Sequence, residues 1–155
     1  MNRKDNTMML SSEFEQSYRA ATPRPEPCLL DRCPLHETCL HWWCKRFVDT
    51  THTQITTVNP LHPLTGTAQC PLYLSSERVV LKRGLFDFFD QMTSRQEHAI
   101  RSSLMQLFNR KNYYRVRNGE MPITPAMRQQ IEDVCRQHGY TGPFVYDSEE
   151  EGWAW

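Results

Sequence analysis

The stretch CLLDRCPLHETCLHWWC, residues 28–44, contains four of the six cysteines in this chain, and Cys70 follows as a fifth. Most other residues between 28 and 70 are short, polar or proline, so the segment has little apolar surface to bury. Burial of apolar surface is the main favourable contribution to folding. A segment that lacks it needs cross-links, which thiols supply through a bound metal or through disulfides. We therefore expect this segment to fold around its sulfur atoms.

The spacing of the cysteines predicts a metal site. Zinc ions and iron–sulfur clusters are held by thiolates that converge from separate chain segments. Three cysteines in one loop and one distant cysteine meet this requirement. The predicted ligands are Cys28, Cys33, Cys39 and Cys70. We predict Zn²⁺ as the cofactor. A [4Fe–4S] cluster is the alternative, because no Cys-x-x-Cys pair singles out zinc, and free or disulfide-bonded thiols are the third interpretation.

Two nearby side chains compete for the fourth ligand position. Cys44 replaces Cys70 if the site is wholly local, and His41 is a further alternative. We prefer Cys70, because it ties the two halves of the segment together. Cys135 lies on the apolar stripe of a predicted helix and is expected to be a small core residue. A catalytic cysteine needs a base and an orienting group fixed beside it, and the sequence fixes neither.

Composition divides the chain into four parts. These are a flexible N-terminus with a short helix and a proline-rich linker (1–27), a cysteine-rich metal-binding module (28–80), a helical domain (81–146) and an acidic aromatic tail (147–155). The predicted fold is mainly α: a metal-stapled module with little regular structure, followed by a small helix-turn-helix-like domain. Within the module we expect a short helix at 40–47 and a strand at 52–58, where β-branched residues alternate. No internal repeat is apparent.

The C-terminal half carries clearer helix signals. A short apolar helix is expected at 84–92, and Ser94-x-x-Glu97 predicts a capping box for the next helix, whose apolar face is Ile100, Leu104, Leu107 and Phe108. A third helix is expected at 111–118, closed by Gly119. The last one is marked by Thr124-Pro125 at its start and Gly139 at its end. Its apolar stripe is Met127, Ile131, Val134 and Cys135.

The region from 78 to 117 is basic, although the whole chain of 155 residues balances 18 basic against 18 acidic residues. It contains nine Lys or Arg and three acids. Within it, residues 109–119 interleave basic and aromatic side chains, a composition suited to phosphate and base contacts. The predicted nucleic-acid-binding residues are Arg110, Lys111, Tyr113, Tyr114, Arg115 and Arg117. The alternative is a solvated helix face.

The last nine residues combine acidic side chains with Trp153 and Trp155. Exposed tryptophans are unfavourable, so we expect the tail to dock. We favour docking on the protein's own core or on the basic face, where the tail is already tethered. A protein partner is the alternative.

Residues 113–125, YYRVRNGEMPITP, resemble helix-turn-helix repressors, in which a recognition helix ends in an Asn-Gly turn before a Thr-Pro-capped helix. The likeness covers residues 94–139 and implies DNA binding. The chain departs from the pattern at 108–110, where no small residue marks the tight turn.

A second resemblance covers most of the chain from Cys28 onward. The residues that carry it are Cys28, Cys33-Pro34, Cys39-Leu40, Asn59-Pro60, Cys70-Pro71, Tyr113-Tyr114-Arg115, Gly119, Gly139 and Trp155. The sequence resembles a family of small Bacteroidales proteins, a domain of unknown function with a four-cysteine pattern. The resemblance implies that the four predicted ligands form one set, with Cys44 and Cys135 outside it. It implies no particular activity.

The expected function is a non-enzymatic, metal-stabilised binding protein, with nucleic-acid regulation as the leading role. A protein-interaction adaptor and an iron–sulfur redox or sensor protein are the alternatives. Paired carboxylates, a phosphate loop and a nucleophile–base arrangement are all missing from the sequence pattern, which argues against an enzyme. No stretch has the roughly 20 apolar residues of a membrane span or a signal-peptide core, so we expect a cytoplasmic protein.

Overall fold

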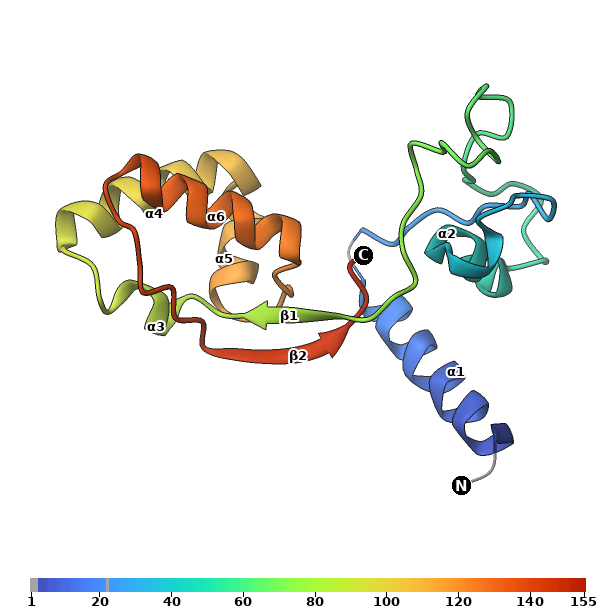
Figure 1. Ribbon diagram of the computed structural model, residues 1–155, viewed down its shortest axis with the longest axis horizontal. Helices are drawn as coiled ribbons and strands as arrows, with labels where there is room; N and C mark the ends of the chain where they lie inside the picture. Colours follow the sequence, from blue (N-terminus) through green and yellow to red (C-terminus); the bar gives the residue numbers. More distant parts are fainter. Residues whose placement is uncertain (1–2, 22) are drawn as a thin grey trace. The chain divides into compact units, whose positions relative to one another are not determined.

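The structure is a computed structural model that describes residues 3–21 and 23–155, with the side chains of the first helix described from Ser12 onward. The chain forms two compact units (Figure 1). We call the residues up to Glu77, together with Trp155, the cysteine-rich unit, and Arg78–Ala154 the helical unit. Helices dominate, as predicted, and a two-stranded sheet is added to them.

The cysteine-rich unit contains one long helix followed by shorter helical elements joined by turns. They are α1 (Arg3–Ala20), the 3₁₀ helix η1 (His36–Thr38), α2 (Leu40–Trp43) and the 3₁₀ helix η2 (Cys44–Phe47). The helix predicted at 40–47 is confirmed as α2 followed directly by η2. Helix α1 is longer than the short helix expected in the flexible N-terminus, since it has 18 residues.

The strand predicted at 52–58 is wrong, because within the described residues this segment is irregular. An alternation of β-branched residues produces a strand only where a neighbouring backbone is free to pair with it. Here only the end of the segment is tied to a neighbour: the Val58 N–H donates to the Pro27 carbonyl at 3.0 Å. Among the described residues of this unit, β-type pairing occurs instead at the bridge between Cys39 and Ser75.

Aromatic rings form a small core beside the cysteines. Phe14 on α1 is 1% exposed and contacts Trp43, Phe47 and Trp155, with ring centroids 5.2–5.7 Å apart. The Trp155 indole N–H also donates to the Ser17 hydroxyl at 2.6 Å. Aromatic pairs at these separations contribute about 0.5–1.5 kcal/mol beyond the area they bury. The unit therefore has a second source of stability besides its thiols.

The helical unit contains β1 (Val79–Arg83), α3 (Phe86–Phe89), α4 (Ser94–Phe108), α5 (Arg110–Arg117), α6 (Pro125–Gln137) and β2 (Ser148–Gly152). The two strands pair antiparallel, with Val79 opposite Gly152 and Arg83 opposite Ser148. Figure 1 shows α4, α5 and α6 gathered on one side of this strand pair.

Capping residues set the helix boundaries. Helix α6 follows the sequence prediction: the Thr124 hydroxyl accepts from the Met127 N–H at 3.3 Å, and Gly139 takes φ 76°. The capping box of α4 lies one residue earlier than predicted, because Thr93 and Gln96 form it rather than Ser94 and Glu97. Ser94 is already the first helical residue.

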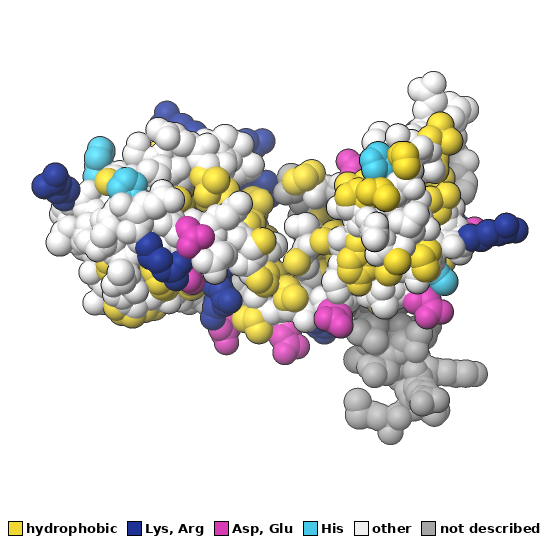
Figure 2. All heavy atoms as spheres, turned by 45° about the horizontal axis from the view of Figure 1, so that its top comes forward, with side chains coloured by type: hydrophobic (Ala, Val, Ile, Leu, Met, Phe, Trp, Pro, Cys, Tyr) yellow, Lys and Arg dark blue, Asp and Glu magenta, His cyan; other side chains and the backbone are white. Residues whose placement is uncertain are grey.

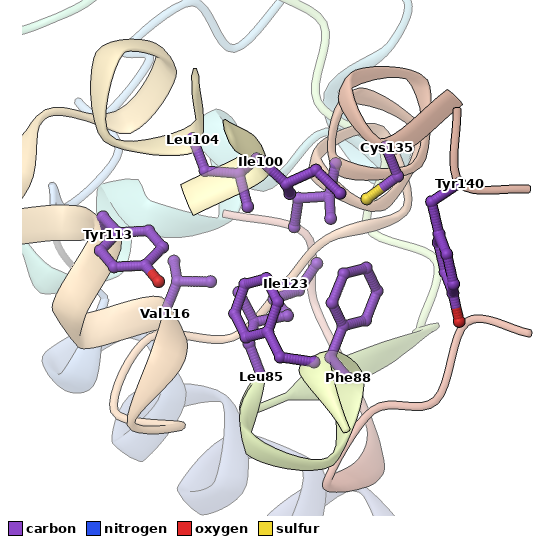
Figure 3. Packing of buried hydrophobic residues seen from close by; sticks show 11 residues of the cluster. Leu85, Phe88, Ile100, Leu104, Tyr113, Val116, Ile123, Cys135 and Tyr140 are labelled. Carbon is purple, nitrogen blue, oxygen red and sulfur yellow. The ribbon is translucent and has the colours of Figure 1, made fainter. Parts of the chain in front are cut away.

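Buried side chains from all four helices and the intervening segments form one core (Figure 3). Ile100, Leu104, Ile131 and Cys135 are fully buried, as the apolar stripes predict. Full burial of such aliphatic side chains contributes about 1.5–3 kcal/mol each. Leu107 is the exception, since it is 44% exposed.

The acidic segment at the C-terminus docks on its own chain, as expected, but not on residues 110–117. It forms β2, and its carboxylates meet the bases of β1 in two ion pairs, Lys82–Glu149 and Arg83–Glu150. Trp153 is 3% exposed beneath the Arg78 guanidinium, which lies 5.3 Å from its ring centroid. Register places Lys82 directly opposite Glu149 and Arg83 diagonally across from Glu150, so the sheet rather than charge alone decides where the segment binds.

A close approach next to β1 gives a stability prediction. Gly84 has φ 75°, and a Cβ there would collide with the Asp147 carboxylate, which accepts the Phe86 and Asp87 N–H groups at 3.1 and 2.9 Å. Gly139 has φ 76° with open space around it. We expect Gly139→Ala to cost about 1–2 kcal/mol from backbone strain alone. Gly84→Ala should cost about 1–3 kcal/mol more from the collision.

Urea unfolding of both variants measures this difference in the free energy of unfolding. Equal losses would mean that Asp147 moves away without cost, which would contradict the predicted collision.

Candidate metal centre

The four cysteines predicted as metal ligands line one cavity in the cysteine-rich unit. Its volume is about 20 Å³. Cys28, Cys33 and Cys39 are each 8% exposed, and Cys70 is half-buried. The remaining lining residues are uncharged or histidine: Leu35, His41, Trp42, Val58, Gly66, Leu72 and Tyr73. The structure therefore brings together cysteines that are far apart in the sequence.

Two turns of the same sequence present two of these cysteines. Cys33 and Cys70 each begin a Cys-Pro-Leu tripeptide, and the leucine of each tripeptide lines the cavity. The Cys33 carbonyl accepts the His36 N–H at 3.2 Å, and the Cys70 carbonyl accepts the Tyr73 N–H at 3.1 Å. Proline favours the second position of such a turn, because its φ is already fixed near the required value. One local conformation is thus used twice around one cavity.

Long-range backbone contacts hold the other two cysteines. The Cys28 N–H donates to the His41 carbonyl at 2.8 Å, which ties the proline-rich segment to α2. Cys39, just before α2, is bridged to Ser75. Backbone hydrogen bonds to separate segments thus fix the positions of Cys28 and Cys39. No regular sheet is needed to bring them to the cavity.

His41 is oriented as a ligating histidine would be. Its Nδ1 lies 2.6 Å from the Glu26 carbonyl oxygen, an acceptor, so Nδ1 carries the proton. The lone pair of the neutral ring is then on Nε2. Metal-binding histidines commonly hold their second nitrogen in this way. Since His41 also lines the cavity, it remains the alternative to one of the thiolates.

The four thiols interact electrostatically. Burial is the largest effect and raises the pKa of the Cys28 thiol, while a backbone hydrogen bond from Leu30 lowers it. Negative charge on Cys33, Cys39 or Cys70 raises the pKa of Cys28 further. Several thiolates side by side are therefore unfavourable without a cation, and a bound cation reverses this by stabilising the deprotonated form.

Cys44 and Cys135 lie apart from the cavity. Both are fully buried, and desolvation raises the pKa of each thiol to about 12. Cys44 lies close enough to Cys39 to interact with it electrostatically, but it does not line the cavity. These two residues pack as small apolar side chains.

The four cysteines line one cavity, but their side chains are not arranged as a formed metal site. Across residues 3–21 and 23–155, no group of three or more His, Cys, Asp or Glu side chains is arranged to hold a metal ion. Zinc–sulfur bonds of about 2.3 Å require the thiolates to converge on one point. The donor types fit zinc, and closing the site around an ion requires the four side chains to move inward.

The residues predicted to contact nucleic acid do not share one surface. Tyr113 is fully buried in the helical core, because α5 turns this face toward α4. In this structure Tyr113 therefore presents no surface to a nucleic acid. Arg117 is half-buried, with its guanidinium 4.8 Å from the Phe86 ring centroid.

The other four members of the predicted set are reachable. Arg110, Lys111 and Tyr114 are exposed, and Arg115 is half-buried. On the face drawn in Figure 2, Lys and Arg side chains of the helical unit are scattered rather than gathered in one stripe. The same view shows apolar side chains gathered on the surface of the cysteine-rich unit.

The sequence contains a local signal for two of the four cysteines. The tripeptide Cys-Pro-Leu occurs at 33–35 and again at 70–72, although the sequence analysis predicts no internal repeat. This repetition points to Cys70 as the partner of the distant loop. The orientation of His41, by contrast, depends on a carbonyl 15 positions away and has no local signal.

The chain matches the family of unknown function DUF6078 over residues 5–155 and belongs to that family. Comparison with curated proteins and comparison with solved structures each found no match. In the described part of the chain, no helix is both long enough and apolar enough to cross a bilayer.

The buried thiols give a reactivity prediction. With a pKa of about 12 instead of 9.0, the thiolate fraction of Cys44 and Cys135 at neutral pH is about 1000-fold lower. We expect iodoacetamide to leave both unmodified in the folded, reduced protein and to modify them rapidly in urea. Peptide mass spectrometry measures the two rates. Comparable rates in folded and unfolded protein would show that these cysteines are accessible.

Proposed function

We propose that this protein binds one Zn²⁺ ion through Cys28, Cys33, Cys39 and Cys70 and uses it to hold the cysteine-rich unit together. The observation that carries the proposal is the common cavity of the four cysteines. Soft thiolate donors favour zinc over magnesium or calcium, which require oxygen ligands. No carboxylate lines the cavity within the described residues.

The size of the cavity favours a single ion over a cluster. A volume of about 20 Å³ accommodates little more than one water-sized sphere. A [4Fe–4S] cluster has eight atoms and would require the surrounding loops to move outward. For the same reason we favour zinc over the iron–sulfur alternative.

A site closed by four thiolates serves a structural role. Catalytic zinc keeps one coordination position open for water or substrate, whereas four protein ligands fill a tetrahedral site. Because the unfolded chain holds no preformed site, the free energy of metal binding contributes to folding. This matches a unit whose loops are short, polar and rich in proline.

Zinc titration tests the proposal. We expect one Zn²⁺ per chain by elemental analysis, and a metal-dependent rise in the thermal stability of the cysteine-rich unit. Cys70→Ser should weaken zinc binding by at least roughly 100-fold, because even loss of an outer-shell partner costs 10–100-fold. Cys44→Ser is the matched control, since it removes a neighbouring thiol that does not line the cavity.

Two results would contradict the proposal. One is equal zinc affinity in the Cys70→Ser variant and the parent protein. The other is a visible absorption band with several irons per chain, which would assign the site to an iron–sulfur cluster.

Nucleic-acid binding through α5 is a second candidate function, with a smaller contact set. Within the described residues, Arg110, Lys111 and Arg115 form no ion pair, so their charge is available. Two phosphate contacts contribute about 1.8 to the slope of log K against log salt concentration. Arg110→Ala with Lys111→Ala should remove this much of the slope for duplex DNA. An unchanged slope, or no binding by the parent protein, would end this hypothesis.

A further inference from the structure

The cavity of the cysteine-rich unit is lined by one more donor than a tetrahedral zinc ion can bind. Four cysteines supply sulfur atoms, and His41 supplies a fifth donor, the lone pair on Nε2. Zinc in structural sites is four-coordinate, so one of the five donors stays outside the coordination sphere at any time. The surroundings of Cys70 and His41 indicate which donor leaves the ion and which one replaces it.

Cys70 is the least constrained of the four cysteines. It is half-buried, whereas the other three are each 8% exposed. In the described structure, the backbone hydrogen bonds of residues 59–73 all stay within that segment. Hydrogen bonds to the rest of the unit are made just outside it, at Val58 and Leu74. Cys70 can therefore move away from the cavity with its loop, without breaking a backbone hydrogen bond to another segment.

His41 is held in place from two sides. Its carbonyl accepts the Cys28 N–H at 2.8 Å, and its ring Nδ1 lies 2.6 Å from the Glu26 carbonyl oxygen. The residue also belongs to α2. A histidine whose second nitrogen is bonded in this way is oriented for metal binding before the ion arrives. Unlike Cys70, it needs no movement of a loop to keep this orientation.

Charge in the cavity favours an exchange between these two donors. Four thiolates around Zn²⁺ leave an excess of two negative charges, and three thiolates with a neutral imidazole leave one. Among the described residues, no Lys or Arg side chain lines the cavity to offset the excess. Burial of uncompensated charge is unfavourable. Replacement of one thiolate by His41 lowers this penalty, which offsets part of the loss of a softer donor.

We propose that His41 replaces Cys70 as the fourth zinc ligand, so that the ion stays bound when the Cys70 thiolate leaves. The other three cysteines bind the ion in both states. The released thiolate of Cys70 is then open to covalent modification while the unit remains folded around its metal. This inference rests on the proposed zinc site and adds a second coordination state to it.

Zinc affinities of four full-length proteins test the exchange: the parent protein, His41→Gln, Cys70→Ser and the double variant. We expect His41→Gln to change the affinity of the parent protein less than threefold, because four thiolates fill the site. In the Cys70→Ser background the same change should lower the affinity at least about tenfold, since loss of even an outer-shell partner costs that much.

His36→Gln is the matched control. The His36 Nδ1 lies 2.7 Å from the Cys33 carbonyl oxygen, but this histidine does not line the cavity. We expect the control to change the zinc affinity less than threefold in both backgrounds. A loss in the Cys70→Ser background as large as that from His41→Gln would overturn the proposal.

A second measurement follows the zinc ion when Cys70 is modified. Zinc-loaded protein is treated with one equivalent of iodoacetamide, so that the attacking sulfur forms a bond to carbon and iodide leaves. Native mass spectrometry, with peptide mapping, should find the modification at Cys70 and one zinc ion still bound to the parent protein. In His41→Gln the same modification should release the ion. Equal retention in both proteins, or earlier modification of another cysteine, would overturn the proposal.

The outcomes distinguish the exchange from the zinc site itself. A parent protein that binds no zinc contradicts the zinc site, and the exchange with it. If the parent protein binds zinc and His41→Gln has the same effect with and without Cys70, the zinc site stands and the exchange is overturned. Zinc binding by His41→Gln in the presence of Cys70 also shows that this variant folds.

Discussion

The cysteine-rich unit depends on one constraint: its loops must be held together although they have little apolar surface to bury. Three cysteines from one loop and one distant cysteine meet at a cavity of about 20 Å³. Backbone hydrogen bonds at Cys28 and Cys39, and matching turns at Cys33 and Cys70, place them there. These contacts alone leave several thiols facing one another, a state that a cation stabilises and that thiolate charge destabilises. Metal binding and folding are therefore expected to be coupled in this unit.

The helical unit is held together by burial of apolar side chains. Its core of aliphatic and aromatic side chains is continuous across α3 to α6, and β1 with β2 covers one edge. Much of the basic charge that looked available for nucleic acid is used inside this unit. Lys82 and Arg83 pair with the acids of β2, and Arg101 pairs with Glu97. Several basic residues of the region 78–117 therefore form ion pairs within the protein.

The sequence by itself determined the features that depend on neighbouring residues. Thr124, Pro125 and Gly139 mark α6 correctly, since caps act through residues within one turn. The periodicity of Ile131 and Cys135 places them in the core for the same local reason. Only the tertiary structure decided that 52–58 forms no strand while 148–152 does, because a strand needs a partner that lies far away in the sequence. It also decided that Tyr113 faces the core and Tyr114 the solvent. The two tyrosines are adjacent on the short helix α5, so the packing of α4 against this helix determines which of them is buried.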